Sequence, residues 1–146
     1  MDFSDIYKSK LTTAAEAVAT IPSNSKMAMG MAMAQPPALL QALADRARAG
    51  QVEALSLYYF EATATAGKTV LDFDLVDRIE PYCMFVTAAD RALIKKSVES
   101  ERKALRYVPN SFHQAPRLLI DDIGIDSFVC TVSPMDQHGR WCTFTV

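Results

Sequence analysis

The chain has 146 residues and a net charge of −2 at pH 7, and half of its residues are apolar while 22% are charged. This length suggests one domain, which can bury roughly 70% of the surface of its unfolded chain, and the composition excludes a disordered protein. Because no broad basic surface is implied, duplex nucleic acid is not expected as a partner.

Two further features of the sequence bear on location. The first ten residues contain acids and lysines but no apolar core like that of a signal peptide. The richest apolar stretch, 27–43, is interrupted by a glutamine and two prolines, so no membrane span is expected. Cys83, Cys130 and Cys142 are odd in number and far apart in sequence, which favours unpaired thiols in a reduced cytoplasm.

The first part of the chain alternates helical and extended patterns. Thr13 followed by Glu16 has the spacing of a capping box. Pro36 and Pro37 suit the first turn of a helix, because the missing N–H has no partner there. In chain order we expect helices over 3–10 and 14–20, a buried strand over 26–30, a helix from 36 to about 48, a strand over 52–60 and a loop over 62–69.

The second part continues this alternation. Residues 70–80 are ambiguous, and after them we expect strands over 82–87 and 105–108, helices over 88–102 and 111–121 (kinked or starting late at Pro116), a strand over 127–132, a turn over 134–139 and a returning strand over 140–146. Strands separated by helices indicate an α/β fold with a mostly parallel sheet and helices on both faces. The last two strands predict an antiparallel hairpin near the C-terminus.

The turn after the first strand is a candidate ligand site. In open α/β sheets, ligands bind beyond the carboxyl ends of the strands, and a following helix N-terminus offers free N–H groups to a carboxylate. Gly30, Met31 and Gln35 occupy this turn, where a bulky Met31 would narrow a pocket and select the shape of a ligand. The alternative is that Met31 and Met33 simply fill gaps in the core.

The ends of two other strands add to this candidate site. Phe60 and Glu61 close the second strand, and the same rule places them beside the first turn. Glu61 is expected to bind a substrate hydroxyl, a water or a neighbouring cation, or, when protonated, a second carboxylate of the substrate; the alternative is a solvated strand end. Ser133 follows a buried strand and is expected to approach the same ligand.

Other polar residues have simpler interpretations. Asn110 or Ser111 is expected to cap the next helix, and His113 in its first turn is a further candidate for active-site contact. Asp136 and His138 are expected to be exposed turn residues, because no third ligand has the spacing of a metal site. The sequence lacks the GxSxG, GxGxxG and P-loop patterns, which argues against an α/β-hydrolase and against nucleotide binding of those types.

Four segments, in this order, resemble the acetyl-CoA hydrolase/transferase family, which includes 4-hydroxybutyrate CoA-transferase. They are IYKSKLTTAAEAVATI from Ile6, GMAMAQPPALLQALADRA from Gly30, VPNSFHQAPRLL from Val108 and VSPMDQHG from Val132. Together they extend from Ile6 to Gly139, and four ordered blocks are a more specific signal than any one of them.

This resemblance implies a longer enzyme with two similarly folded α/β halves and an active site between them. Residues 1–146 would be the N-terminal part, and the family's nucleophilic glutamate would lie in the second half, so no catalytic residue is expected in this chain. The implied reaction moves CoA from an acyl-CoA to a small carboxylic acid, such as itaconate or another dicarboxylic or hydroxy acid, through a glutamyl-CoA thioester. No cofactor or metal is implied besides the CoA thioester substrate, and relatives form homo-oligomers.

Two alternatives stay open at this point. An acyl-CoA hydrolase of the same family would let water replace the acceptor acid. A chain that is naturally this short would instead be a non-catalytic binding or assembly module.

Overall fold

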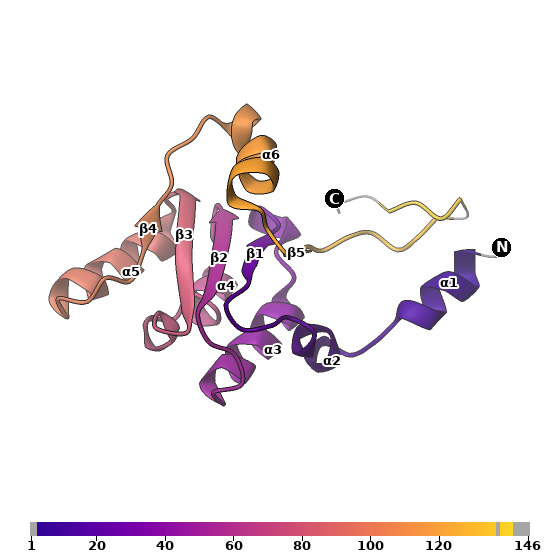
Figure 1. Cartoon of the computed structure of the whole chain (residues 1–146), viewed down its shortest axis with the longest axis horizontal. Coiled ribbons are helices and arrows are strands. Elements are labelled where there is room, and N and C mark those ends of the chain that lie inside the picture. The colour runs from indigo at the N-terminus through magenta and orange to yellow at the C-terminus, as the bar shows by residue number, and fades with distance from the viewer. Residues whose placement is uncertain (1–2, 137, 142–146) are drawn as a thin grey trace.

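The computed structural model describes residues 3–136 and 138–141 and contains a five-stranded parallel sheet with helices packed on it (Figure 1). The strand order is β4-β3-β2-β1-β5, and every neighbouring pair runs parallel. The strands are β1 Lys26–Met29, β2 Leu55–Phe60, β3 Ile79–Phe85, β4 Arg106–Tyr107 and β5 Ser127–Val129. The helices are α1 Phe3–Lys10, α2 Ala14–Ala19, α3 Pro37–Arg48, α4 Ala64–Lys68, α5 Ala88–Glu99 and α6 Ala115–Arg117, with 3-10 turns over Ala32–Ala34, Phe73–Leu75 and Phe112–Gln114 and a π-helical turn over Leu118–Ile123.

The predicted capping box at the start of α2 is confirmed. The Thr13 hydroxyl accepts from the Glu16 N–H at 3.2 Å, and the Glu16 carboxylate accepts from the Thr13 N–H at 3.0 Å. Hydrogen bonds from Thr12 and Thr13 lower the pKa of Glu16 to about 2. At the other end of α2, the Arg46 guanidinium of α3 donates to the Val18 carbonyl at 2.6 Å, which fixes α2 against α3.

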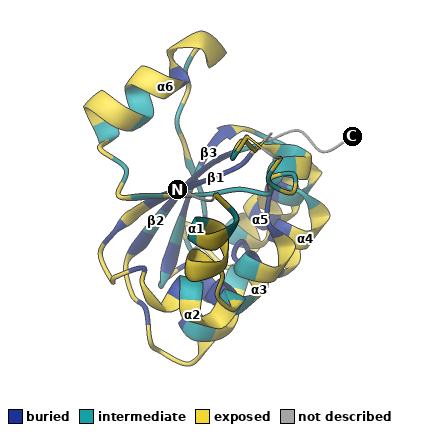
Figure 2. Ribbon diagram, turned by 90° about the vertical axis from the view of Figure 1, so that its right-hand side faces the viewer, coloured by how far each residue is buried: buried dark blue, intermediate teal, exposed yellow. Residues whose placement is uncertain are grey.

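One face of the sheet is closed by α2, α3, α4 and α5 (Figure 2). Side chains at alternate strand positions point to this side, as the period of two in a strand requires. The buried members include Met27, Met29, Leu57, Tyr59 and Cys83 from the strands, and Leu40 and Leu43 from α3. The main hydrophobic core therefore lies on this side of the sheet.

The opposite face is covered by α6 and the turn that follows it (Figure 2). Ala28, Tyr58 and Met84 are buried there, and the rings of Tyr58 and Tyr82 stack with their centroids 4.6 Å apart. Phe128 pairs with Ala28 from the edge strand β5, yet it is 56% exposed. This face is therefore only thinly covered toward β5.

The C-terminal end of the sheet differs from expectation. Among the described residues all strand pairs are parallel, so the predicted antiparallel hairpin is wrong there. The Thr131 N–H donates to the Ala34 carbonyl at 2.8 Å, and this bond holds the chain beyond β5 against the turn after β1 instead of letting it fold back. Of the expected strand over 140–146, the first two residues are not in a strand, and 142–146 lie outside the described residues.

Two helical segments also depart from expectation. The predicted loop over 62–69 contains α4, because the Thr63 hydroxyl accepts from the Ala66 N–H at 3.2 Å and caps this short helix. The predicted helix over 111–121 is three consecutive helical pieces, with Pro116 in the middle one, where the ring removes a backbone donor. The other expected helices and strands are present, with ends that differ from expectation by up to three residues.

Helix α1 and the last described residues lie beside each other, away from the sheet (Figure 1). No residue of α1 is buried. A Cβ placed on Gly139 would be 2.7 Å from the Phe3 ring, so the two segments touch closely. Helix α1 thus contacts the C-terminal segment and contributes no residue to the main core.

Candidate functional site

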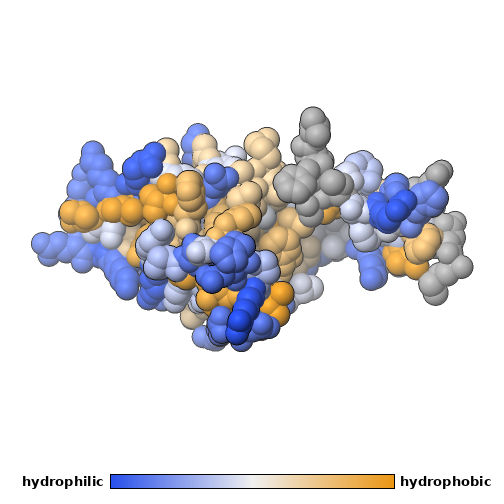
Figure 3. Space-filling view, turned by 90° about the horizontal axis from the view of Figure 1, so that it is seen from above, coloured by the Kyte–Doolittle hydropathy of each residue, from blue (hydrophilic) through white to orange (hydrophobic). Residues whose placement is uncertain are grey.

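The carboxyl ends of the parallel strands meet at one edge of the sheet, which is the expected position of a ligand site (Figure 1). Seen from above, apolar side chains run across the molecule between hydrophilic ones (Figure 3). Large exposed side chains at or just beyond the strand ends are Met31, Met33, Phe85, Tyr107 and Phe112. The edge is therefore accessible and partly apolar.

Close backbone packing determines the turn after β1. The Gly30 N–H donates to the Val129 carbonyl at 2.8 Å. A Cβ on Gly30 would lie 2.4 Å from the Ala34 carbonyl oxygen, so no larger residue fits unless the backbone moves. Ala32 has a φ of +46°, a left-handed conformation that costs free energy when a Cβ is present. Met31 projects from this turn with 36% of its surface exposed.

The end of β2 holds a second residue in the left-handed region. Glu61 has a φ of +42°, and the register between β2 and β3 shifts just before it, between Tyr59 and Phe60. Strained residues of this kind persist where the surrounding structure holds them, and they cluster at functional sites. The Phe60 ring meets the Phe112 ring edge-on, with centroids 5.4 Å apart, which joins the end of β2 to the segment after β4.

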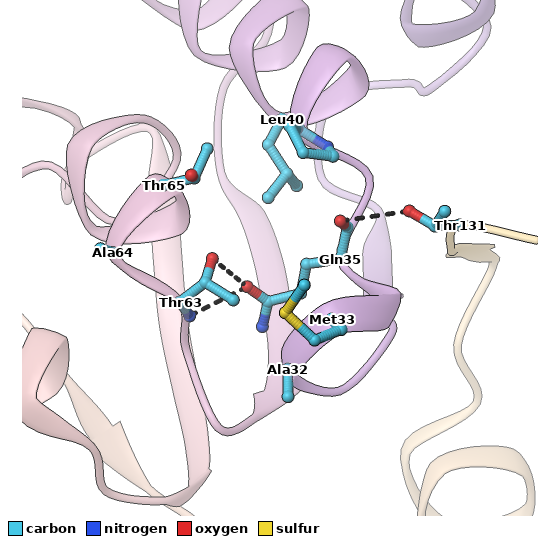
Figure 4. A pocket seen from close by; sticks show the side chains of 9 residues that line it. Ala32, Met33, Gln35, Leu40, Thr63, Ala64, Thr65 and Thr131 are labelled. Atoms are coloured by element: carbon cyan, nitrogen blue, oxygen red, sulfur yellow. Dashed lines mark hydrogen bonds between the residues drawn. The ribbon is translucent and has the colours of Figure 1, made fainter. Parts of the chain in front are cut away.

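Gln35 connects the two turns (Figure 4). Its Nε2 donates to the carbonyls of Glu61 at 3.1 Å and Phe60 at 3.4 Å. Its Oε1 accepts from both the N–H of Thr63, at 3.0 Å, and the Thr63 hydroxyl, at 2.8 Å. The Gln35 backbone carbonyl also accepts from the Thr131 hydroxyl at 3.2 Å. Gln35 is 3% exposed, and its side-chain amide is engaged inside the protein.

A cavity of about 430 Å³ opens between the start of α3 and the start of α4 (Figure 4). Its lining combines apolar side chains with three threonines and consists of Ala32, Met33, Gln35, Pro37, Leu40, Thr63, Ala64, Thr65 and Thr131. Of the six predicted site residues, Gln35 lines this cavity, whereas Gly30, Met31, Phe60, Glu61 and Ser133 do not. The sequence analysis missed the threonines at 63 and 65, because it predicts a plain loop there; the threonine before a run of small residues was the available capping signal.

The remaining sequence candidates lie away from this cavity. Ser133 lies in the irregular segment beyond β5, and its hydroxyl donates to the Pro134 carbonyl at 3.1 Å. His113 is exposed in the 3-10 turn after β4. The Asp136 carboxylate accepts from the His138 N–H at 2.8 Å, as expected for a turn residue.

A buried carboxylate lies behind the strand ends, and the sequence analysis did not predict it. Asp90 of α5 is fully buried and accepts from the Tyr59 hydroxyl at 2.6 Å and from the Thr87 N–H at 2.6 Å and hydroxyl at 2.7 Å. Burial, followed by the nearby Asp90 carboxylate, raises the pKa of Tyr59, so the phenol stays protonated and donates. The Thr87 hydroxyl also lies 3.1 Å from the Ala62 carbonyl, which connects this network to the turn that bears Glu61. The spacing of Thr87 and Asp90 is that of a capping box, and this was the available signal.

Some kinds of site are absent from the described part of the chain. Across residues 3–136 and 138–141, no three His, Cys, Asp or Glu side chains gather in a way that would hold a metal ion. Within the same residues, no helix has the length and apolar character needed to cross a membrane.

Comparison with known proteins identifies close relatives of this arrangement. The acetyl-CoA hydrolase/transferase N-terminal domain matches residues 1–146. The crystal structure of RipA from Yersinia pestis is 56% identical with a TM-score of 0.93, and the match covers 97% of this chain and 33% of RipA. The M31G mutant of RipA is 54% identical with a TM-score of 0.96, covering 98% of this chain and 33% of that one.

Other solved RipA structures carry the substitutions F60M and E61V, and two more change a glutamate numbered beyond the length of this chain. Succinyl-CoA:cyclohexane-1-carboxylate CoA transferase of Geobacter metallireducens is 28% identical over 141 residues, which are 96% of this chain and 30% of that enzyme. The chain therefore spans about a third of the length of these relatives.

Proposed function

The chain belongs to the acetyl-CoA hydrolase/transferase family, and from this premise we propose that it forms one wall of the active-site cleft of a CoA-transferase. The observation that carries the proposal is the position of Met31, Phe60 and Glu61 at or just beyond the ends of the neighbouring parallel strands β1 and β2, in two strained turns. The RipA variants M31G, F60M and E61V add support, because they change these three residue types under the same numbers in a protein 56% identical to this chain.

The other wall of the cleft is proposed to come from a segment outside residues 1–146, and so is the nucleophilic glutamate. The relatives are about three times as long as this chain, which leaves ample sequence for a second α/β half. The exposed apolar side chains at the strand ends also support a covering partner, since Met33 is 81% exposed and Phe112 is 66% exposed. No residue of this chain is assigned the role of nucleophile.

The proposed chemistry is covalent catalysis by that glutamate. Its carboxylate attacks the thioester carbonyl of an acyl-CoA and expels CoA thiolate, which leaves a mixed anhydride. The thiolate then attacks the glutamyl carbonyl, releasing the donor acid and leaving a glutamyl-CoA thioester. The acceptor carboxylate attacks this thioester and expels CoA thiolate, which leaves a second anhydride, and the thiolate then attacks the acyl carbonyl of this anhydride to give the new acyl-CoA and the free glutamate.

This chain is proposed to select the acid that reacts. Met31 narrows the space above the turn after β1, and Phe60 with Phe112 provides an aromatic wall. Glu61 is partly buried and is proposed to contact a hydroxyl or a protonated second carboxyl of the acid. A small dicarboxylic or hydroxy acid fits these contacts, with itaconate as the specific proposal, and Ser133 is proposed to approach it from the β5 side.

The proposed setting is a homo-oligomer in a reduced cytoplasm. In the described residues Cys83 and Cys130 are free thiols, and burial raises the pKa of Cys83 to about 12, so this thiol stays neutral. Both observations agree with a protein that does not depend on disulfides.

The test is to trap the covalent intermediate on the full-length enzyme that contains this chain. The enzyme is incubated with an acyl-CoA and no acceptor acid, digested, and the CoA adduct is assigned to a peptide by mass spectrometry. We expect the adduct on a glutamate outside residues 1–146, and formation of a new acyl-CoA when itaconate is added. Glu61→Gln should weaken use of the dicarboxylic acid, whereas Glu53→Gln, at an exposed glutamate, should not.

Each other outcome corrects a specific part of the proposal. An adduct on Glu61 would overturn its assignment to substrate binding. Release of free acid and CoA at a rate independent of the acceptor acid would indicate an acyl-CoA hydrolase. Absence of both adduct and turnover would contradict an enzymatic role and favour a binding or assembly module.

A further inference from the structure

Gln35 has the contacts of a residue that acts through its neighbours. Its amide spans the gap between the turn after β1 and the end of β2, and both of its ends are bound. A side chain that donates to Glu61 and accepts from Thr63 cannot offer the same atoms to a ligand. These contacts engage the amide of Gln35 inside the protein, and direct contact between Gln35 and substrate stays a prediction.

The backbone that Gln35 contacts at the end of β2 is strained. Glu61 has a φ of +42°. A glycine adopts this conformation without steric cost, whereas the Cβ of a glutamate makes it unfavourable. The register between β2 and β3 shifts before Phe60, and Glu61 lies just beyond the last residue of β2. The Gln35 Nε2 donates to the carbonyls of both residues, and its Oε1 accepts from Thr63 at the start of α4.

The contacts of Gln35 extend to a third strand. Its own carbonyl accepts from the Thr131 hydroxyl, and the neighbouring Ala34 carbonyl accepts from the Thr131 N–H. The segment after β5 is therefore tied to the same point as the ends of β1 and β2. One buried residue thus fixes three strand ends that are adjacent in the sheet.

We infer that Gln35 is a positioning residue that sets the left-handed turn at Glu61 and, through it, the placement of the Glu61 carboxylate and the Phe60 ring in the substrate cleft. This inference rests on the proposed function for its catalytic consequence, but its structural part stands on the hydrogen bonds alone. Positioning matters for rate because a displacement of about 1 Å in a substrate-contacting group can cost on the order of 100-fold in activity.

The first test replaces Gln35 by methionine in the full-length enzyme, which keeps the length of the side chain, removes its side-chain hydrogen bonds and leaves the bond from Thr131 to the backbone carbonyl. We expect kcat/KM for the acid substrate to fall about 100-fold. Amide hydrogen exchange at Thr63 should accelerate, because that N–H loses its acceptor. The matched control is Gln41→Met on the exposed face of α3, which should change neither quantity.

The second test is Gln35→Glu, which separates positioning from mere filling of space. An ionised glutamate still accepts from Thr63 but cannot donate to the Phe60 and Glu61 carbonyls, so we expect kcat/KM at pH 8 to fall about tenfold, the equivalent of one hydrogen bond. Protonation restores an O–H donor, and burial favours the protonated form, so activity should rise toward that of the parent as the pH falls. Among the described residues that hydrogen-bond to Gln35, Glu61 alone has a titratable side chain, and the parent enzyme measured over the same pH range is the reference.

The results that would overturn the inference are distinct from those that would overturn the proposed function. If the parent enzyme forms a glutamyl-CoA adduct but Gln35→Met leaves kcat/KM and Thr63 exchange unchanged, Gln35 is not a positioning residue. If kcat/KM falls while Thr63 exchange is unchanged, Gln35 contacts substrate directly. If the parent forms no adduct at all, the proposed function fails, and accelerated Thr63 exchange in Gln35→Met still supports the structural part.

Discussion

The two faces of the sheet are built from the same strands but are packed very differently. On the face covered by α2 to α5, strand side chains such as Leu57 and Ile79 are fully buried. On the face covered by α6, alternate residues of the same strands form a smaller cluster around Tyr58, and Phe128 on β5 is more than half exposed. Adjacent residues of one strand, such as Leu57 and Tyr58, thus pack on opposite faces, one closed by helices and one partly open.

This contrast separates the closed face, which stabilises the fold, from the open face and the strand ends, which are accessible to a ligand or a partner. A closed helical layer with a continuous core is sufficient to fix the sheet, because burial of apolar surface is the main favourable term in folding. The thinly covered face and the strand ends can then carry large apolar side chains and strained turns without supporting the fold. The proposed second half of the cleft would cover this open side.

The largest expected effect comes from truncating one side chain on each face. Leu57→Ala should lower the free energy of unfolding by about 3 kcal/mol, because it leaves a cavity in the closed core. Phe128→Ala should cost less than about 1 kcal/mol in this chain, since over half of the ring is already in contact with solvent. Urea denaturation of the 146-residue chain measures both values. Equal losses would show that the second face is as fully packed as the first.

The second prediction concerns the backbone packing of the turn after β1, at the open edge of the sheet. Gly30→Ala should destabilise the chain by about 2 kcal/mol, because the new Cβ meets the Ala34 backbone at 2.4 Å and neither side can move freely. The control is Gly124→Ala, where φ is +67° but nothing lies within 4 Å, so about 1 kcal/mol of left-handed strain is the expected cost. Thermal unfolding of both variants gives the difference. A smaller loss at Gly30 than at Gly124 would mean that the turn after β1 adjusts easily and is not rigidly determined.

Two neighbouring tyrosines provide a finer probe of the same contrast. Tyr59→Phe should cost about 1.5 kcal/mol, because it removes a 2.6 Å hydrogen bond and leaves the buried Asp90 carboxylate short of a donor. Tyr58→Phe should cost less than about 0.5 kcal/mol, because the ring still stacks on Tyr82. Chemical denaturation of the two variants measures both losses in the free energy of unfolding. If Tyr58→Phe were the more costly change, the polar support of the sheet would lie on the open face.

The sequence alone predicts the parts of this arrangement that depend on local rules. The capping box at Thr13 and the proline start of α3 each have a short-range signal, and the structure confirms them. The strand-end rule also predicts that Met31, Phe60 and Glu61 lie at one edge of the sheet. Their binding of substrate stays a prediction.

The parts that the sequence does not predict depend on contacts between distant residues. Left-handed backbone at Ala32 and Glu61 has no signature, because neither residue type favours that conformation. The bonds from Thr131 to Ala34 and Gln35 join residues almost a hundred positions apart and hold the segment after β5 against the turn after β1. Local β-propensity does not predict whether this segment folds back on itself or binds the turn after β1, because that turn is distant in sequence.

The smallest effect on stability, and the sharpest on reactivity, is expected at the two free cysteines that the structure describes. Cys83 is fully buried on the closed face, and burial raises its pKa to about 12, whereas Cys130 at the end of β5 is partly exposed and burial raises its pKa as well. At pH 8 iodoacetamide should therefore modify Cys130 on the order of 100-fold faster than Cys83, because the thiolate and its access decide the rate.

The pH dependence of stability has a definite sign at Cys83. Its folded pKa lies above the ordinary value of 9.0, so the neutral thiol favours folding at every pH below 9. This contribution should be lost progressively between pH 9 and about 12, as the thiol of the unfolded chain ionises while the buried thiol does not. Replacing Cys83 by alanine removes this part of the alkaline slope at a cost in packing, and the same change at Cys130 should alter the slope less. Peptide mapping after alkylation, together with denaturation at pH 8 and pH 10.5, measures both consequences, and rapid labelling of Cys83 at pH 8 would show that the helix-covered layer opens without global unfolding.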